Sequence, residues 1–185
     1  KYTFVAHSGM AHCNPISAAK ADEVVSLLDL SSGATAIDVG CGKAEMLMRI
    51  MERFGCSGMG VDRSPHMIAA ARQEAARRGI SGRLDLHEGD AAQLLVSPAS
   101  AGAALCIGAT EALGGFRSCI QTLAGLLRPG GFALVGEGFW RKDPGPEFLT
   151  ALGATRDDYL DHAGNVAAGA AAGLIPHYAA VSSDD

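Results

Sequence analysis

Charged and aromatic residues are scarce in this sequence, and long apolar runs are missing. Of its 185 residues, 19% are charged and 5% are aromatic. No stretch approaches the ~18 consecutive apolar residues of a membrane span, and the first residues carry no apolar signal-peptide core. We therefore expect a soluble, cytoplasmic protein with no membrane partner.

Basic residues are too few and too scattered to follow a nucleic acid. The chain has 15 Lys and Arg against 20 Asp and Glu, a formal net charge of -5, and no window concentrates the basic residues. Proteins that bind nucleic acid normally carry a basic patch or stripe. We therefore expect no nucleic-acid partner.

Paired cysteines are missing as well. The five cysteines are odd in number, widely separated and without a Cys-x-x-Cys pair: Cys13, Cys41, Cys56, Cys106 and Cys119. This pattern favours reduced thiols of a cytosolic protein over a disulfide framework or a zinc site. His12 beside Cys13 could start a metal site, but no partner with ligand spacing follows, so we expect no metal.

The chain does have enough apolar residues for one core, and strands alternate with helices along it. With 48% hydrophobic residues, it is most simply a single domain spanning residues 1–185. Apolar patterns predict six strands, at residues 34–39, 58–62, 83–90, 103–108, 131–139 and 173–181. Helical spacing predicts helices at residues 17–30, 46–54, 65–79, 116–127 and 156–172, with a proline-rich loop at 141–148. The alternation predicts a doubly wound α/β fold, with a mostly parallel sheet and helices on both faces.

The turn after the first predicted strand concentrates the strongest functional signal. In "AIDVGCGKAEM", residues 36–46, Asp38 ends an apolar run and Gly40 and Gly42 follow, with Cys41 between them. Ligands of open parallel sheets bind outside the carboxyl ends of the strands, and this turn lies there. Glycine lacks a Cβ atom, so backbone N–H groups can approach a ligand closely. Small size explains Cys41 in this turn as well as a nucleophilic role does.

Two common nucleotide-binding patterns do not fit this turn. A dinucleotide fingerprint would place a third glycine at position 45, but Glu45 stands there, and we expect its carboxylate to point toward the pyrophosphate position. A Walker-type loop is also missing, since Lys43 follows Gly42 without the required loop or a following Ser or Thr. The sequence therefore disfavours NAD.

The stretch resembles motif I of class I S-adenosylmethionine-dependent methyltransferases, acidic-x-Gly-x-Gly-x-Gly, with Ala44 in the third glycine position. Later signals follow in the family's order: Asp62 ends the second strand, and "LLRPGG", residues 126–131, matches the turn before the fifth. The resemblance covers residues 20–140. It implies a Rossmann-like class I methyltransferase fold, S-adenosylmethionine as cofactor and S-adenosylhomocysteine as product.

The resemblance also implies roles for individual residues. Asp62 corresponds to the residue that binds the ribose hydroxyls, which agrees with chemistry, because a carboxylate can accept two charge-assisted hydrogen bonds from them. Asp90 and Ala91 follow the third strand, where the family contacts the adenine. The cofactor-binding residues implied are Asp38, Gly40, Cys41, Gly42, Asp62, Arg63, Asp90, Ala91 and Gly108.

The resemblance divides the chain into an N-terminal lid and helix (1–30), a cofactor-binding core (34–140) and an acceptor-side segment (141–185). A flexible terminus is the alternative to a lid. Since an acceptor hydroxyl or ammonium must lose a proton, His12 or Glu111 is the candidate general base. Candidate acceptor-binding residues are Asn14, Glu137 and Trp140, although Trp140 could instead cover the core.

Departures from the family pattern narrow the activity. Gly102 stands where many relatives start the fourth strand with Asp, so a role that rests on that residue is lost. The Asp/Asn-Pro-Pro-Tyr signature of enzymes acting on DNA bases or protein glutamine is absent, which favours methyl transfer to an O, N or S atom of a small molecule. The class fold usually ends with a seventh, antiparallel strand, and too little chain follows residue 181 to supply it.

Two other functions stay open at this stage. A catalytically silent domain could bind S-adenosylmethionine without transferring its methyl group, and an NAD-dependent reductase would share the fold. An arsenite methyltransferase would need clustered thiols, which the cysteine spacing does not offer.

Overall fold

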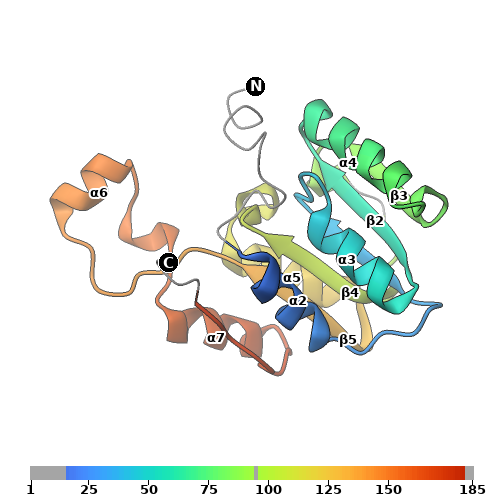
Figure 1. Ribbon diagram of the computed structural model, residues 1–185. Coiled ribbons are helices and arrows are strands. Elements are labelled where there is room, and N and C mark those ends of the chain that lie inside the picture. The colour runs from blue at the N-terminus through green and yellow to red at the C-terminus, as the bar shows by residue number, and fades with distance from the viewer. Residues whose placement is uncertain (1–15, 94–95, 182–185) are drawn as a thin grey trace.

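A five-stranded, wholly parallel sheet with the strand order β3-β2-β1-β4-β5 forms the centre of the computed structural model, which describes residues 16–93 and 96–181 (Figure 1). Its strands are β1 (Thr35–Val39), β2 (Ser57–Asp62), β3 (Leu84–Glu88), β4 (Ala101–Ile107) and β5 (Leu127–Gly136). Strand order reverses between β1 and β4, which is where ligands of open α/β sheets bind. The prediction of a doubly wound α/β fold is confirmed.

The first four helices of the described chain begin within one residue of the positions that the sequence predicts. The helices are α2 (Ala18–Ser26), α3 (Glu45–Phe54), α4 (Pro65–Arg77), α5 (Phe116–Leu126), α6 (Pro146–Leu152) and α7 (His162–Ala171). The Ser17 and Ser64 side chains accept the N-terminal hydrogen bonds of α2 and α4, and Gly55 ends α3 with a φ of 68°. Side-chain caps and a left-handed glycine satisfy backbone groups that a helix leaves free at its ends.

Side chains of the sheet alternate between two hydrophobic clusters, one on each face. Ala36 and Leu105 pack with α2, α3 and α4 on one face, and Ile37 and Cys106 pack with α5 on the other. The helix α7 lies against the outer side of α5. Helices therefore cover both faces of the sheet, as the apolar strands require.

The C-terminal part differs from the prediction in three places. Residues 173–181 form no strand, because the segment turns back at the end of α7 and places Tyr178 against Glu23 of α2 rather than against the edge of β5. Pro176 also lacks the N–H that a central ladder would need. The predicted helix at 156–172 is shorter: a 3-10 turn, Arg156–Asp158, comes first, and Asp161 caps α7. The expected loop at 141–148 contains the start of α6, with proline at its first position.

No helix within residues 16–93 or 96–181 has both the length and the apolar character needed to cross a membrane.

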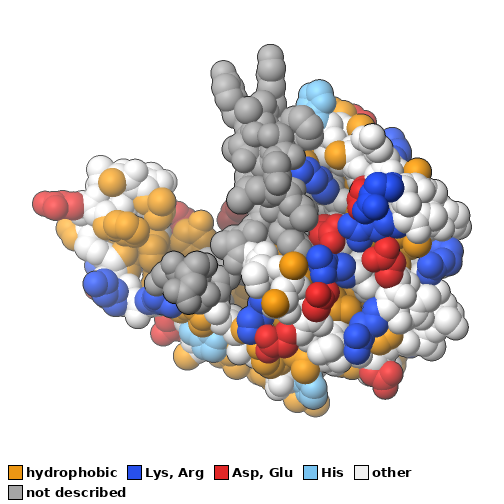
Figure 2. Space-filling view, in the orientation of Figure 1, with side chains coloured by type: hydrophobic (Ala, Val, Ile, Leu, Met, Phe, Trp, Pro, Cys, Tyr) orange, Lys and Arg blue, Asp and Glu red, His pale blue; other side chains and the backbone are white. Residues whose placement is uncertain are grey.

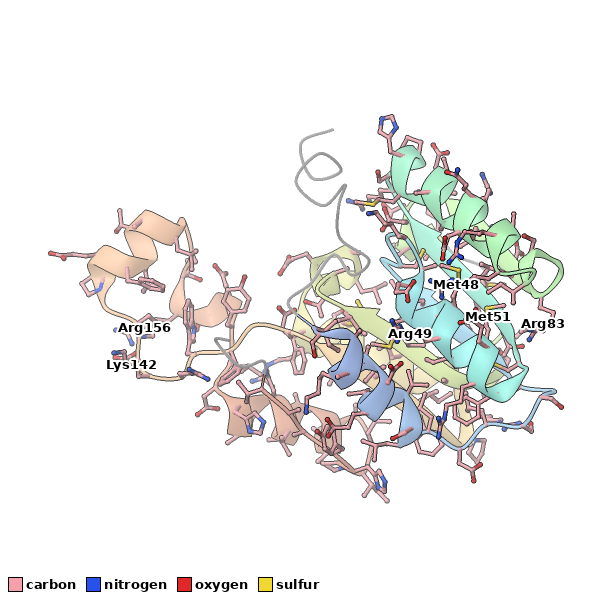
Figure 3. The ribbon with its side chains drawn as sticks, in the orientation of Figure 1. Met48, Arg49, Met51, Arg83, Lys142 and Arg156 are labelled. Atoms are coloured by element: carbon pink, nitrogen blue, oxygen red, sulfur yellow. The ribbon has the colours of Figure 1, made fainter. Side chains whose placement is uncertain are left out.

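An ion-pair network joins the three helices of the first face. Glu45 is only 9% exposed, and its carboxylate binds Arg49 one turn along α3 and Arg78 at the end of α4. Arg49 also pairs with Asp22 of α2 (Figure 3). Figure 2 shows acidic and basic side chains interleaved over this region. Because opposite charges here pair with one another, we interpret the network as a structural tie between α2, α3 and α4.

Arg78→Ala is expected to destabilise the fold by about 2–4 kcal/mol, because a nearly buried carboxylate loses a partner. Urea denaturation of the variant measures this loss. Arg77→Ala is the matched control, since Arg77 is the adjacent residue, is 71% exposed, and pairs with the partly exposed Glu74. An equal loss in both variants would contradict the role given to Arg78.

Candidate functional site

The glycine turn between β1 and α3 is held against the end of β2. The backbone N–H groups of Gly40 and Cys41 both donate to the carbonyl of Val61, at 2.9 and 3.0 Å. Gly40 has a φ of 70° and Gly42 a φ of 53°, which is the left-handed region that favours glycine. A Cβ atom at Gly40 would overlap the Cβ of Ala109, so this position also needs glycine for space.

Asp62, the last residue of β2, faces the turn with its carboxylate. Its Oδ2 accepts from the N–H of Gly42 at 2.8 Å, and its Oδ1 accepts from the N–H of Ser64 at 2.8 Å. An ionised carboxylate has about four acceptor positions, so both oxygens can still accept further bonds. The structure therefore brings Asp62 and the glycine turn together, and fixes the orientation of the carboxylate.

Asp38 lies behind the turn and is nearly buried. Its side chain is 5% exposed, and desolvation together with the charge of Asp62 raises the pKa of its carboxyl to about 8. Burial, and then the charges of Asp38 and Asp62, raise the pKa of the Cys41 thiol as well. The sulfur of Cys41 packs under Gly60, where an added Cβ would lie 2.9 Å from it. Cys41 is therefore a small core side chain, with no activated thiolate for nucleophilic chemistry.

Asp90 lies beyond the end of β3 and forms an ion pair with Arg63. The guanidinium of Arg63 contacts Asp90 Oδ2 at 2.8 Å, and the N–H of Ala92 contacts Oδ1 at 3.1 Å. The Ala92 bond and then the Arg63 bond lower the pKa of Asp90. Ala91 begins the 3-10 turn Ala91–Gln93. Arg63 and Asp90 thus lie together at the carboxyl ends of neighbouring strands, β2 and β3.

The end of β4 faces the glycine turn from the other side. Gly108 has a φ of 70° and its N–H donates to the carbonyl of Gly136 at 2.8 Å. Thr110 begins the 3-10 turn Thr110–Leu113 and is 2% exposed. Its hydroxyl donates to the carboxylate of Glu137, which follows β5 directly. Glu137 therefore bridges the carboxyl ends of β4 and β5.

Glu111 and Trp140, also predicted on the acceptor side, lie in different surroundings from Glu137. Glu111 is exposed on the 3-10 turn, with its carboxylate toward Gly115. Trp140 contacts Phe148 and Tyr159 edge to face, and its ring N–H donates to the carbonyl of Arg156 at 3.0 Å. Trp140 therefore belongs to the segment after β5 and does not cover the main core.

His12 and Asn14 fall outside the residues that the structure describes. In the part of the chain that it does describe, no group of three or more His, Cys, Asp or Glu side chains could hold a metal ion.

The predicted direction of the Glu45 side chain is wrong. The Glu45 carboxylate does not point into a pyrophosphate position but turns along α3 to Arg49 and Arg78. The missing glycine at position 45 therefore argues against a dinucleotide better than the charge of Glu45 does. Ala44, at the third glycine position of the methyltransferase pattern, has a φ of 57° and is fully buried. Sequence reasoning also missed Thr110 and Tyr159, since no motif marks them and only the folded chain places them beside Glu137 and Gly138.

The chain matches a family model described as a methyltransferase domain over residues 36–131, more than half of its length. It is 34% identical over 157 residues, 84% of this chain, to the uncharacterized protein YjhP of Escherichia coli K12, and it spans 63% of the length of that relative.

Two solved structures are similar to this one over almost the whole chain. The S-adenosylmethionine-dependent methyltransferase of Geobacter sulfurreducens, in complex with S-adenosylhomocysteine, has a TM-score of 0.83 and 33% identity, covering 92% of this chain and 69% of its own. The S-adenosylmethionine-dependent methyltransferase of Thiobacillus denitrificans, in the same kind of complex, has a TM-score of 0.82 and 33% identity, covering 94% and 70%. With its parallel sheet, glycine turn and paired carboxylates at the strand ends, the chain belongs to the class I S-adenosylmethionine-dependent methyltransferase family.

Proposed function

We propose that this protein transfers a methyl group from S-adenosylmethionine to a small-molecule acceptor. The observation that carries the proposal is the Asp62 carboxylate, held by the Gly42 N–H beside a turn where only glycine fits. The Geobacter relative, crystallised with S-adenosylhomocysteine, supports the choice of cofactor.

The described residues fit this cofactor chemically. Asp62 presents acceptor positions to the paired hydroxyls of a ribose, and charge-assisted bonds of this kind are the stronger ones. Asp90, with Arg63 beside it at 2.8 Å, would accept a hydrogen bond from the adenine amino group. Asp38, behind the turn, would contribute a largely protonated carboxyl that can donate a hydrogen bond, because burial and then the charge of Asp62 raise its pKa to about 8. Gly40, Cys41, Gly42, Ala91 and Gly108 would contribute backbone surface.

Bound S-adenosylmethionine supplies an electrophilic methyl group on a positively charged sulfur. The residues of this chain would bind the donor, hold the acceptor in line and exclude water. Positioning of this kind can lower a barrier by about 7–11 kcal/mol. A general base, His12 or Glu111 in the proposal from sequence, is needed only when the acceptor must lose a proton.

Asp62→Asn is expected to weaken S-adenosylhomocysteine binding by about 10- to 100-fold, the value of a hydrogen bond to a charged group. Calorimetry on the wild-type chain and the variant measures the affinity. Asp85→Asn is the matched control, because Asp85 is an exposed aspartate on β3 whose partner is His87, at 2.9 Å. Its affinity should equal that of the wild type.

Three outcomes would contradict the proposal or redirect it. No heat of binding with the folded wild-type chain would refute the proposed cofactor, and binding of NAD in its place would indicate a reductase. Binding without any demethylated cofactor, when mass spectrometry follows incubation with a metabolite pool, would indicate a silent binding module.

A further inference from the structure

We propose that the methyl acceptor is a small-molecule amine, bound as its ammonium ion by Glu137; this inference rests on the function proposed above. Glu137 stands at the carboxyl end of β5, and the argument depends on its contacts, the rings beside it and the charges along this edge of the sheet.

A short series of contacts connects Glu137 to the glycine turn. Gly40 touches Ala109 so closely that no side chain fits between them. Thr110 follows Ala109 in the chain and donates its hydroxyl hydrogen to Glu137. The Glu137 carboxylate therefore lies just beyond the wall of the cofactor turn, where an acceptor must approach the methyl group.

The carboxylate is fixed in orientation but not saturated. One oxygen accepts from the Thr110 hydroxyl, and the other, Oε1, accepts from the N–H of Gly138 at 2.7 Å. A carboxylate has about four acceptor positions, so the two bonds leave room for N–H groups of a ligand. Because Thr110 is 2% exposed, the hydroxyl that fixes the carboxylate is protected from competing water.

Aromatic rings lie beside Gly138, the residue that follows Glu137 and donates to its carboxylate. The ring of Tyr159 covers Gly138, with Cε1 3.0 Å from where a Cβ atom would be. Trp140 contacts that ring edge to face, with centroids 5.2 Å apart. Aromatic faces attract cations such as an ammonium group. An alcohol or a thiol is uncharged, so it would gain neither this attraction nor an ion pair with Glu137.

The carboxyl edge of the sheet carries several acidic groups from different strands. Asp62, Glu111 and Glu137 lie at or just beyond the ends of β2, β4 and β5. Ionised acidic groups gathered at one edge of a protein raise the local concentration of cations and disfavour anions. This field favours an amine over a carboxylate or phosphate acceptor.

An ammonium ion must lose one proton before its nitrogen can attack, and Glu137 is the group placed to take it. The nitrogen lone pair then forms the N–C bond, the C–S bond breaks, and its electron pair stays on sulfur. The product is a methylammonium ion, and the proton on Glu137 leaves to water. This assigns to Glu137 the part that the sequence alone suggested for His12 or Glu111.

Binding of three probes with one carbon skeleton tests the inference: 2-phenylethylamine, 2-phenylethanol and 2-phenylethanethiol. Each is titrated into the full chain saturated with S-adenosylhomocysteine. We expect the amine to bind at least about tenfold more tightly than the other two, and Glu137→Gln to abolish that preference. Thr110→Val should weaken amine binding by a smaller factor, because it removes only the bond that orients the carboxylate.

Affinity for S-adenosylhomocysteine separates this inference from the proposed function. It should stay unchanged in Glu137→Gln and in the control Glu147→Gln, a matched change on exposed α6 that should also leave the amine preference intact. Equal binding of the three probes, no binding of the amine, or a preference that survives in Glu137→Gln overturns the inference alone. Failure of the wild-type chain to bind S-adenosylhomocysteine overturns both proposals.

Discussion

Gly40→Ala is expected to destabilise the protein by about 2–5 kcal/mol, and to abolish binding of S-adenosylhomocysteine. An alanine at the Gly40 φ of 70° carries a left-handed strain of about 1–2 kcal/mol. The new Cβ atom also overlaps Ala109, and overpacking of this kind costs about 1–3 kcal/mol. This overlap is relieved only if the turn moves away from the end of β4. That movement displaces the residues proposed to hold the cofactor.

Gly79→Ala separates strain from overlap. Gly79 has the same φ of 70°, but an added Cβ there meets no atom within 4 Å. We expect Gly79→Ala to lose only the free energy of unfolding that the left-handed strain costs, and to bind S-adenosylhomocysteine like the wild type. Denaturation and calorimetry on both variants provide the comparison. Equal stability and equal affinity in the two variants would contradict the tight contact inferred at Gly40.

The second large effect is a dependence of stability on pH that Asp38 produces. Burial, and then the charge of Asp62, raise its pKa from 3.8 to about 8 in the folded chain. Between these values the folded state retains a proton that the unfolded state has lost. The unfolded state therefore binds fewer protons, and stability falls as pH rises through this window, by at most about 1.4 kcal/mol per unit. Above pH 8 the contribution becomes constant.

Asp38→Asn removes this titration while keeping the shape of the side chain. We expect the variant to gain stability relative to the wild type as pH rises from 5 to 8, measured as the difference in urea denaturation midpoints. A stability difference that does not change with pH would contradict the assignment.

Large hydrophobic side chains are exposed mainly in the C-terminal segment of the described fold. Figure 2 shows hydrophobic side chains gathered around α6, and Phe148 is 58% and Leu152 53% exposed. The chain spans 63% of the curated relative's length. Exposed apolar patches of this kind normally mark an interaction site.

Local signals in the sequence determined the order of the elements, their caps and the cofactor turn. Ser17, Ser64, Pro65 and Gly55 act through backbone groups within a few residues, so their effect is readable from spacing alone. The alternation of apolar strands and amphipathic helices leaves few ways to bury both faces of a parallel sheet, and the fold class follows from that constraint. Asp38, Gly40, Gly42 and Asp62 converge because carboxyl ends of parallel strands meet at one edge.

Only the tertiary structure decided which long-range partners meet. Glu45 faces Arg78, 33 positions later, and Thr110 faces Glu137, 27 positions later. Residues 173–181 have the composition of a strand, but tertiary context overrides strand propensity, and this segment rests on α2 through Tyr178. Such contacts depend on how helices and strand ends pack in space, a property that spacing along the chain does not encode.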